Sequence, residues 1–141
     1  MAAGDQIRYR AGYKYHLKAD YRVQLRFIRP THDIESEFIT LTRDGWLWIR
    51  HGYAWDGPSG PTIDTKDGMR GSLVHDALYQ LMRDGWLCRK EDRDKADREF
   101  FVILLEDKMH PARATAWFAC VRIGAEWAAK ASGEKPLMFA P

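Results

Sequence analysis

The sequence predicts an α+β domain, with N-terminal antiparallel β-strands and hairpins followed by a three-helix C-terminal half. Large apolar and polar residues alternate in the first half, which is typical of half-buried strands. From residue 71 onward the apolar residues recur at helical spacing instead. Because a run of strands followed by a run of helices folds into segregated layers, the two patterns together indicate the α+β class.

A single domain is expected to span residues 1–141. Its length of 141 residues lies within the range of about 100–200 residues that one domain usually has. We predict a strand-rich half over about residues 1–56, a loop with several glycines and prolines over 57–70, a helical half over 71–132 and a tail without periodicity over 133–141.

Four strands are expected in the first half. They cover residues 13–17, 21–27, 38–42 and 46–50. The last two are joined by Arg43-Asp44-Gly45, and an Asp-Gly pair between apolar runs is a strong hairpin signal.

The fourth of these strands is apolar on both faces. Trp46 and Trp48 share one face, and Leu47 and Ile49 share the other. We interpret this pattern as a strand covered by helices on one face and by a loop on the other. The alternative is an aromatic face that contacts lipid or a partner protein.

Three helices are expected after the loop, over about residues 71–83, 91–109 and 111–131. Glu91 favours the start of the second helix, because carboxylates stabilise a helix N-terminus. Pro111 favours the start of the third, since proline is common in the first turn.

Composition and charge exclude several classes of protein. The net charge is +2 and the two signs are interleaved, so no basic stripe for nucleic acid is expected. No apolar run is long enough for a signal peptide or a membrane span, so any membrane contact would be peripheral. The 2 cysteines are too few for a disulfide framework and suit a reducing compartment.

Asp97 is the most informative residue for chemistry. It precedes Phe100 and Leu104 at helical spacing and therefore lies on the apolar stripe of the second helix. A carboxylate that faces a core needs a hydrogen-bonding or charged partner. His75 shares a helix face with Leu78 and Met82, and it can supply that partner if the first two helices pack antiparallel through their stripes.

Such a pair has two interpretations. In the functional one, a buried Asp accepts the proton of one ring nitrogen, and the other nitrogen of His75 serves as a general base. The adjacent Asp76 carboxylate, with carbonyl oxygens from the preceding loop, would hold Ca²⁺, which polarises a carbonyl group. In the structural one, His75 and Asp97 are only a satisfied polar pair between two helices.

Three segments together resemble the phospholipase A2 pattern. In that family a glycine loop precedes a His-Asp-x-x-Tyr helix, and an Asp lies on the antiparallel helix. The short separation here resembles the disulfide-free form in parvovirus capsid proteins. The matching segments are Gly57-Pro58-Ser59-Gly60, Leu73-Val74-His75-Asp76-Ala77-Leu78-Tyr79 and Ala96-Asp97-Arg98-Glu99-Phe100.

A longer set of motifs resembles DUF1353, a family of uncharacterised phage and prophage proteins. It adds residues 56–61 and Val121-Arg122-Ile123-Gly124 to the His-Asp and Asp segments. The family name does not settle a biochemical function. It implies a phage protein, located in the virion or in the host cytoplasm.

The phospholipase resemblance implies a role for each catalytic residue. His75 would be the base that activates water, Asp97 would orient it, and Tyr79 would steady Asp97 through a hydrogen bond.

The same resemblance implies a calcium site. Asp76 would be the carboxylate ligand, with carbonyl oxygens near Gly57, Ser59 and Gly60 as further ligands. Asp56 would be another ligand or a cap that fixes the loop. The chain departs from the secreted family, because it lacks that family's disulfides and the strand half has no counterpart there.

The expected function is a calcium-dependent, phospholipase A2-like lipid or ester hydrolase, associated with the virion and acting on the host envelope. Its partners would be host membrane lipid or phage tail proteins, and not nucleic acid. One alternative is a non-catalytic tail or baseplate adaptor with the same fold. Another is an HD-type metal phosphohydrolase, because His51, His75-Asp76 and Asp97 follow its ligand order.

Overall fold

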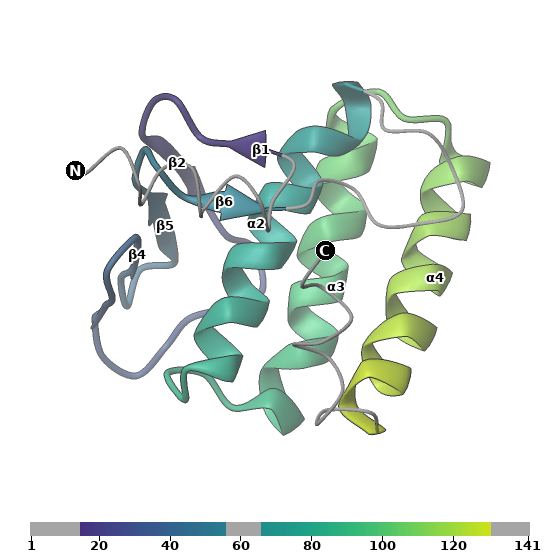
Figure 1. Ribbon diagram of the computed structural model, residues 1–141. Coiled ribbons are helices and arrows are strands. Elements are labelled where there is room, and N and C mark those ends of the chain that lie inside the picture. Colours follow the sequence, from purple (N-terminus) through teal and green to yellow (C-terminus); the bar gives the residue numbers. More distant parts are fainter. Residues whose placement is uncertain (1–14, 56–65, 131–141) are drawn as a thin grey trace.

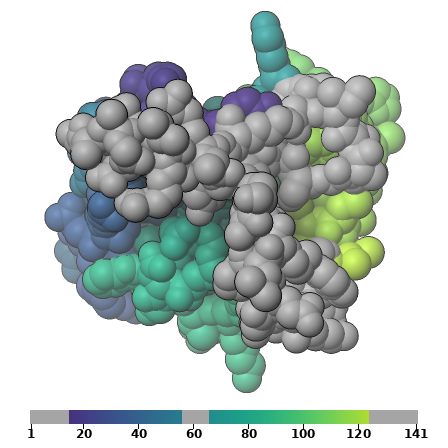
Figure 2. All heavy atoms as spheres, viewed as in Figure 1, coloured from purple at the N-terminus to yellow at the C-terminus, as the bar shows by residue number. Residues whose placement is uncertain are grey.

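The computed structural model describes residues 15–55 and 66–130, with the side chains of its last helix described up to residue 123. Strands occupy one side of the molecule and three helices the other (Figure 1). Helix α3 lies between α2 and α4, and the strands lie on the far side of α2 from α4. The space-filling view in Figure 2 shows the same division between strand residues and helical residues. The predicted α+β class is therefore confirmed.

Within residues 15–55, the strands form two antiparallel sheets. The larger one has the order β2-β5-β4-β3, and the smaller one pairs β1 with β6. All four predicted strands are present, and β3 and β6 are additional. The last three of the four are shorter than predicted, and residues 13–14 of the first lie outside the described residues. Their bounds are β1 Tyr15–His16, β2 Tyr21–Gln24, β3 Ile34–Glu35, β4 Ile39–Leu41, β5 Trp46–Ile49 and β6 Ala54–Trp55.

The predicted hairpin between β4 and β5 is present. The amide of Gly45 donates to the carbonyl of Thr42 over 2.9 Å, and the amide of Thr42 donates to that of Trp46 over 3.0 Å. Gly45 has a φ of 86°, which side chains rarely adopt, and the guanidinium of Arg29 lies where its Cβ would be. Glycine is therefore required at this turn.

The described residues form three helices, α2 Lys66–Arg83, α3 Arg89–Glu106 and α4 Pro111–Lys130. The predicted loop over 57–70 is wrong at its end, because residues 66–70 are helical. Gly71 explains the difference, since a Cβ there would lie 3.1 Å from Leu104 Cδ2 and 3.2 Å from Phe100 Cδ1. Gly71 lowers the helix propensity of α2 but lets this helix pack closely against α3, and packing overrides propensity.

Helix α3 ends earlier than the sequence predicts. Lys108 has a left-handed φ of 71°, and the amide of Met109 donates to the carbonyl of Leu104 over 3.0 Å. This arrangement closes the last turn in the manner of a Schellman motif, so the helix ends at Glu106 rather than at Met109.

The main core lies between the larger sheet and α2. The inward residues of the sheet, Leu47 and Ile49 among them, are fully buried. Trp46 and Trp48 on the other face are 44% and 38% exposed. The interpretation that a loop covers this face is therefore wrong, because these rings contact solvent.

Candidate functional site

The site is built from facing positions on α2 and α3. His75 Nε2 and Asp97 Oδ1 are 2.7 Å apart. The Asp97 side chain is 0% exposed and that of His75 is 12% exposed. The sequence prediction that these two residues lie on facing apolar stripes and meet is confirmed by this contact.

Asp97 has two further partners, which bring the number of helices at the site to three. Tyr79 on α2 donates its hydroxyl to Oδ1 over 2.8 Å. Arg122 on α4 donates Nη1 to Oδ2 over 2.7 Å. Both carboxylate oxygens are therefore hydrogen-bonded, which is what a fully buried carboxylate requires.

These partners keep Asp97 ionised. Burial alone would raise the pKa of Asp97, but the hydrogen bonds and charges of His75, Tyr79 and Arg122 outweigh it and lower the pKa below the ordinary value. Burial and the neighbouring Asp97 charge raise the pKa of Tyr79 far above its ordinary value, so Tyr79 remains a neutral donor.

The ionised state of Asp97 fixes the tautomer of His75. A carboxylate can only accept hydrogen bonds, so Nε2 of the neighbouring ring carries the proton. In the neutral ring the lone pair then lies on Nδ1, which makes no hydrogen bond within the part of the chain that the structure describes. This is the arrangement that a general base requires.

Two aromatic rings hold the imidazole in place. The ring centroid of Tyr79 lies 4.3 Å from that of His75, and the ring of Phe100 lies 5.1 Å from it. Because one ring from α2 and one from α3 pack against the imidazole, its orientation is set before any ligand binds.

Sequence reasoning did not assign a role to Arg122. The sequence does carry a signal for Arg122. It is the only charged residue between Ala114 and Ile123, and the rest of this run is suited to burial. It also lies 3.4 Å from Asp94 Oδ1, so its guanidinium joins two carboxylates of α3.

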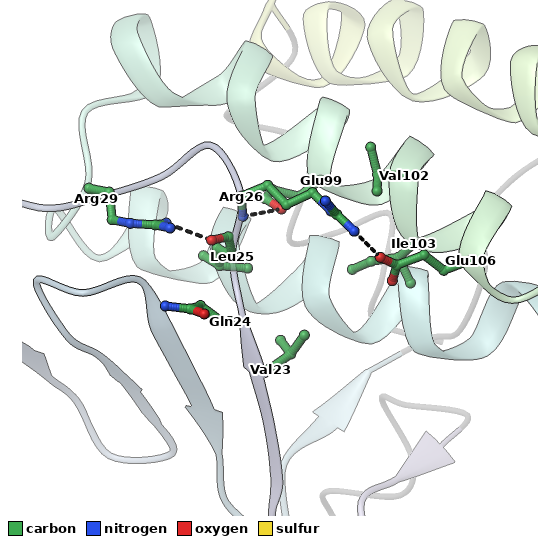
Figure 3. Close-up of a pocket in the computed structure, with 9 residues that line it drawn as sticks. All are labelled: Val23, Gln24, Leu25, Arg26, Arg29, Glu99, Val102, Ile103 and Glu106. Carbon is green, nitrogen blue, oxygen red and sulfur yellow. Dashed lines mark hydrogen bonds and ion pairs between the residues drawn. The ribbon is translucent and has the colours of Figure 1, made fainter.

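Glu99 was also missed as a buried carboxylate. It lies on the stripe of Ala96 and Ile103 and accepts the backbone amides of Arg26 and Phe27 over 3.1 Å and 2.6 Å. The contact fixes the segment after β2 against α3 (Figure 3). Glu99 also lines a groove of about 480 Å³, and His75 is not among the residues that line this groove.

The predicted calcium ligands fall into two groups. Asp56, Gly57, Ser59 and Gly60 lie outside the described residues. Asp76 is half-buried on α2, directly after His75.

The described residues contain no group of three or more His, Cys, Asp or Glu side chains that could hold a metal ion. His51, His75, Asp76 and Asp97 are all among them, so the ligand set of an HD-type phosphohydrolase does not form. His51 instead contacts Asp20, over 2.9 Å.

The fold and site define an α+β domain with a buried, oriented His–Asp pair. Comparisons with known protein families, curated proteins and solved structures gave no match for the chain. The resemblances to phospholipase A2 and to DUF1353 therefore stay predictions that rest on the quoted motifs.

Proposed function

We propose that the protein is a hydrolase of lipid or other ester bonds with His75 as its general base. The observation that carries the proposal is the bond between His75 Nε2 and the ionised, fully buried Asp97, which leaves Nδ1 with the lone pair. The phospholipase A2-like spacing of His75, Tyr79 and Asp97 supports a lipid ester as the substrate class.

In the proposed reaction Nδ1 of His75 accepts a proton from a water molecule, and the water oxygen attacks the ester carbonyl carbon. The bond to the leaving alcohol then breaks, and the imidazolium returns its proton to the leaving oxygen. Asp97 stabilises the imidazolium through Oδ1, and Arg122 and Tyr79 keep the carboxylate in place.

Calcium is part of the proposal through Asp76. A half-buried carboxylate directly after the base fits one hard oxygen ligand, and the carbonyl oxygens near Gly57, Ser59 and Gly60 would complete the set. When bound, Ca²⁺ supplies a Lewis acid that polarises the ester carbonyl and stabilises the oxyanion.

The proposed setting is a phage particle or a phage-infected cell, with the host envelope as the source of lipid. The motifs that resemble DUF1353 support this setting. No helix in the described ranges is long and apolar enough to cross a bilayer. Mass spectrometry of purified virions tests whether the protein is a particle component.

A structural role is the second candidate. The hydrogen bonds of Asp97 join α2, α3 and α4, and such a cluster would also suit an adaptor in a tail or baseplate. An assay of fatty-acid release separates the structural role from the hydrolase.

The experiment measures fatty-acid release from phospholipid vesicles with Ca²⁺ and with EDTA. The wild type is compared with His75→Gln and Asp97→Asn. His51→Gln is the matched control, because His51 also contacts an aspartate but is 74% exposed. We expect Ca²⁺-dependent release that both site variants lose and the control keeps. Absence of release from folded wild-type protein would refute the hydrolase proposal and leave the structural one.

A further inference from the structure

We propose that the outer face of the larger sheet is a binding site for a neutral oligosaccharide. The site is a groove of about 400 Å³ on the side of the sheet away from α2. It is independent of the His75 site and of the function proposed for it. Its lining residues are Arg22, Asp33, Thr40, Thr42, Arg43, Asp44, Trp46 and Trp48.

The groove has a rigid aromatic wall. The indole N–H of Trp48 donates to Asp20 over 3.3 Å. The guanidinium carbons of Arg22 and Arg50 lie 5.4 Å and 5.7 Å from the centre of its ring. Because Trp48 is already fixed by these contacts, binding against it costs little side-chain entropy.

Trp46 is the open platform beside this wall. Trp46 and Trp48 are two residues apart on β5, so their side chains leave the same face about 7 Å from each other. The ring of Trp46 is 44% exposed, and no cationic side chain of the described residues covers it. A flat apolar surface of this size fits the C–H face of a sugar ring.

The polar lining supplies the hydrogen bonds that sugar hydroxyls need. The Arg43 guanidinium and the Asp44 carboxylate have no side-chain partner within the described ranges. One oxygen of Asp33 accepts the backbone amide of Arg43 over 2.9 Å, which leaves the other for a ligand. Donors and acceptors thus line the same groove as the Trp46 ring, which suits hydroxyl groups that both donate and accept.

The charge balance favours a neutral ligand over the other classes that bind aromatic surfaces. Two arginines and two aspartates line the groove, so its formal charge is zero. Nucleic acid requires a positive groove for its phosphates, and the two carboxylates oppose it. They also oppose an anionic membrane surface. Aspartate is depleted in protein–protein interfaces, and both Asp33 and Asp44 line this groove, which disfavours a protein partner.

The proposal is tested with neutral hexasaccharides of glucose, N-acetylglucosamine, galactose, mannose and rhamnose. Binding to the full chain is followed by the ¹H–¹⁵N signals of the tryptophan indoles. We expect saturable shifts of the Trp46 and Trp48 signals with at least one hexasaccharide. Trp46→Ala should weaken that binding about tenfold or more, through loss of the stacking surface.

Trp86→Ala is the matched control, because Trp86 is equally exposed, at 44%, and does not line the groove. It should leave binding unchanged. Asp44→Asn and Arg43→Gln should each weaken binding, and they keep the test valid if Trp46→Ala does not fold. Absence of saturable shifts with every hexasaccharide would overturn the proposal. Equal weakening by Trp86→Ala would also overturn it, as would shifts caused only by phosphatidylglycerol vesicles or oligothymidylate.

Discussion

The protein contains two His–Asp contacts of nearly the same length in opposite environments. His75 and Asp97 lie 2.7 Å apart with side chains 12% and 0% exposed, whereas His51 and Asp20 lie 2.9 Å apart at 74% and 41%. Distance alone therefore does not distinguish a candidate site from a surface contact. Burial distinguishes the two, because water cannot replace a hydrogen-bonding partner that is lost in the interior of the protein.

The two aspartates also have lowered pKa values for different reasons. The backbone and ring of His51 lower the pKa of Asp20, which lies in solvent. The pKa of Asp97 is lowered although burial opposes it, so three donors from two helices must act together. Only the second arrangement places the carboxylate in the interior, where α2, α3 and α4 meet.

The largest effect is expected for Asp97→Ala. It leaves the hydroxyl of Tyr79 and the charge of Arg122 without their buried acceptor, which costs about 3–5 kcal/mol of unfolding free energy. Asp20→Ala should cost much less, because the side chain of Asp20 is 41% exposed and water replaces the lost contact. Urea unfolding monitored by circular dichroism measures both. Equal losses for the two variants would show that burial is not what separates the pairs.

Arg122→Gln should have the next largest effect. It removes a charge-assisted hydrogen bond to Asp97 Oδ2, and we expect a loss of about 1.5–3 kcal/mol. Arg122→Lys should recover part of it, since the charge is kept but the planar geometry is lost. A loss below about 0.5 kcal/mol in urea unfolding would mean that α4 does not stabilise the site.

The sequence predicts the centre of this site and not its full extent. Asp97 could be placed beside His75 because each interrupts an apolar helical stripe with a group that needs a partner. Arg122 could not be placed in the same way, because its stripe does not show which face of α4 meets α3. The start of α2 was missed because the glycines at 68 and 71 suggest a loop, and only the structure shows that Gly71 allows the close approach of Phe100 and Leu104.

The surface of the larger sheet was harder still to predict. Alternation in β5 places Trp46 and Trp48 on one face, but large apolar side chains on both faces predict burial on both. Which face is buried depends on where α2 packs, and that contact is long-range. The two short strands β3 and β6 have only two residues each, so they carry no periodicity to detect.

The third prediction concerns acid stability. The pKa of Asp97 is lowered in the folded state, so its contribution to stability is present above its unfolded value of 3.8 and is lost as the pH falls through the lower folded value. The gap in unfolding free energy between wild type and Asp97→Asn should therefore narrow as the pH falls below about 4. Urea unfolding from pH 6 to pH 2 measures it, and a constant gap would contradict an ionised Asp97.

The smallest effect is expected for His51→Gln. The ring of His51 is mostly in solvent, so water replaces the lost contact with Asp20, and the change in unfolding free energy should stay within about 0.5 kcal/mol. The matched change His75→Gln should cost more, because a glutamine amide loses the packing of the imidazole against the rings of Tyr79 and Phe100. If both variants unfold at the same urea concentration as wild type, the buried pair contributes no more to the fold than the exposed one. The case for His75 would then rest on esterase activity alone.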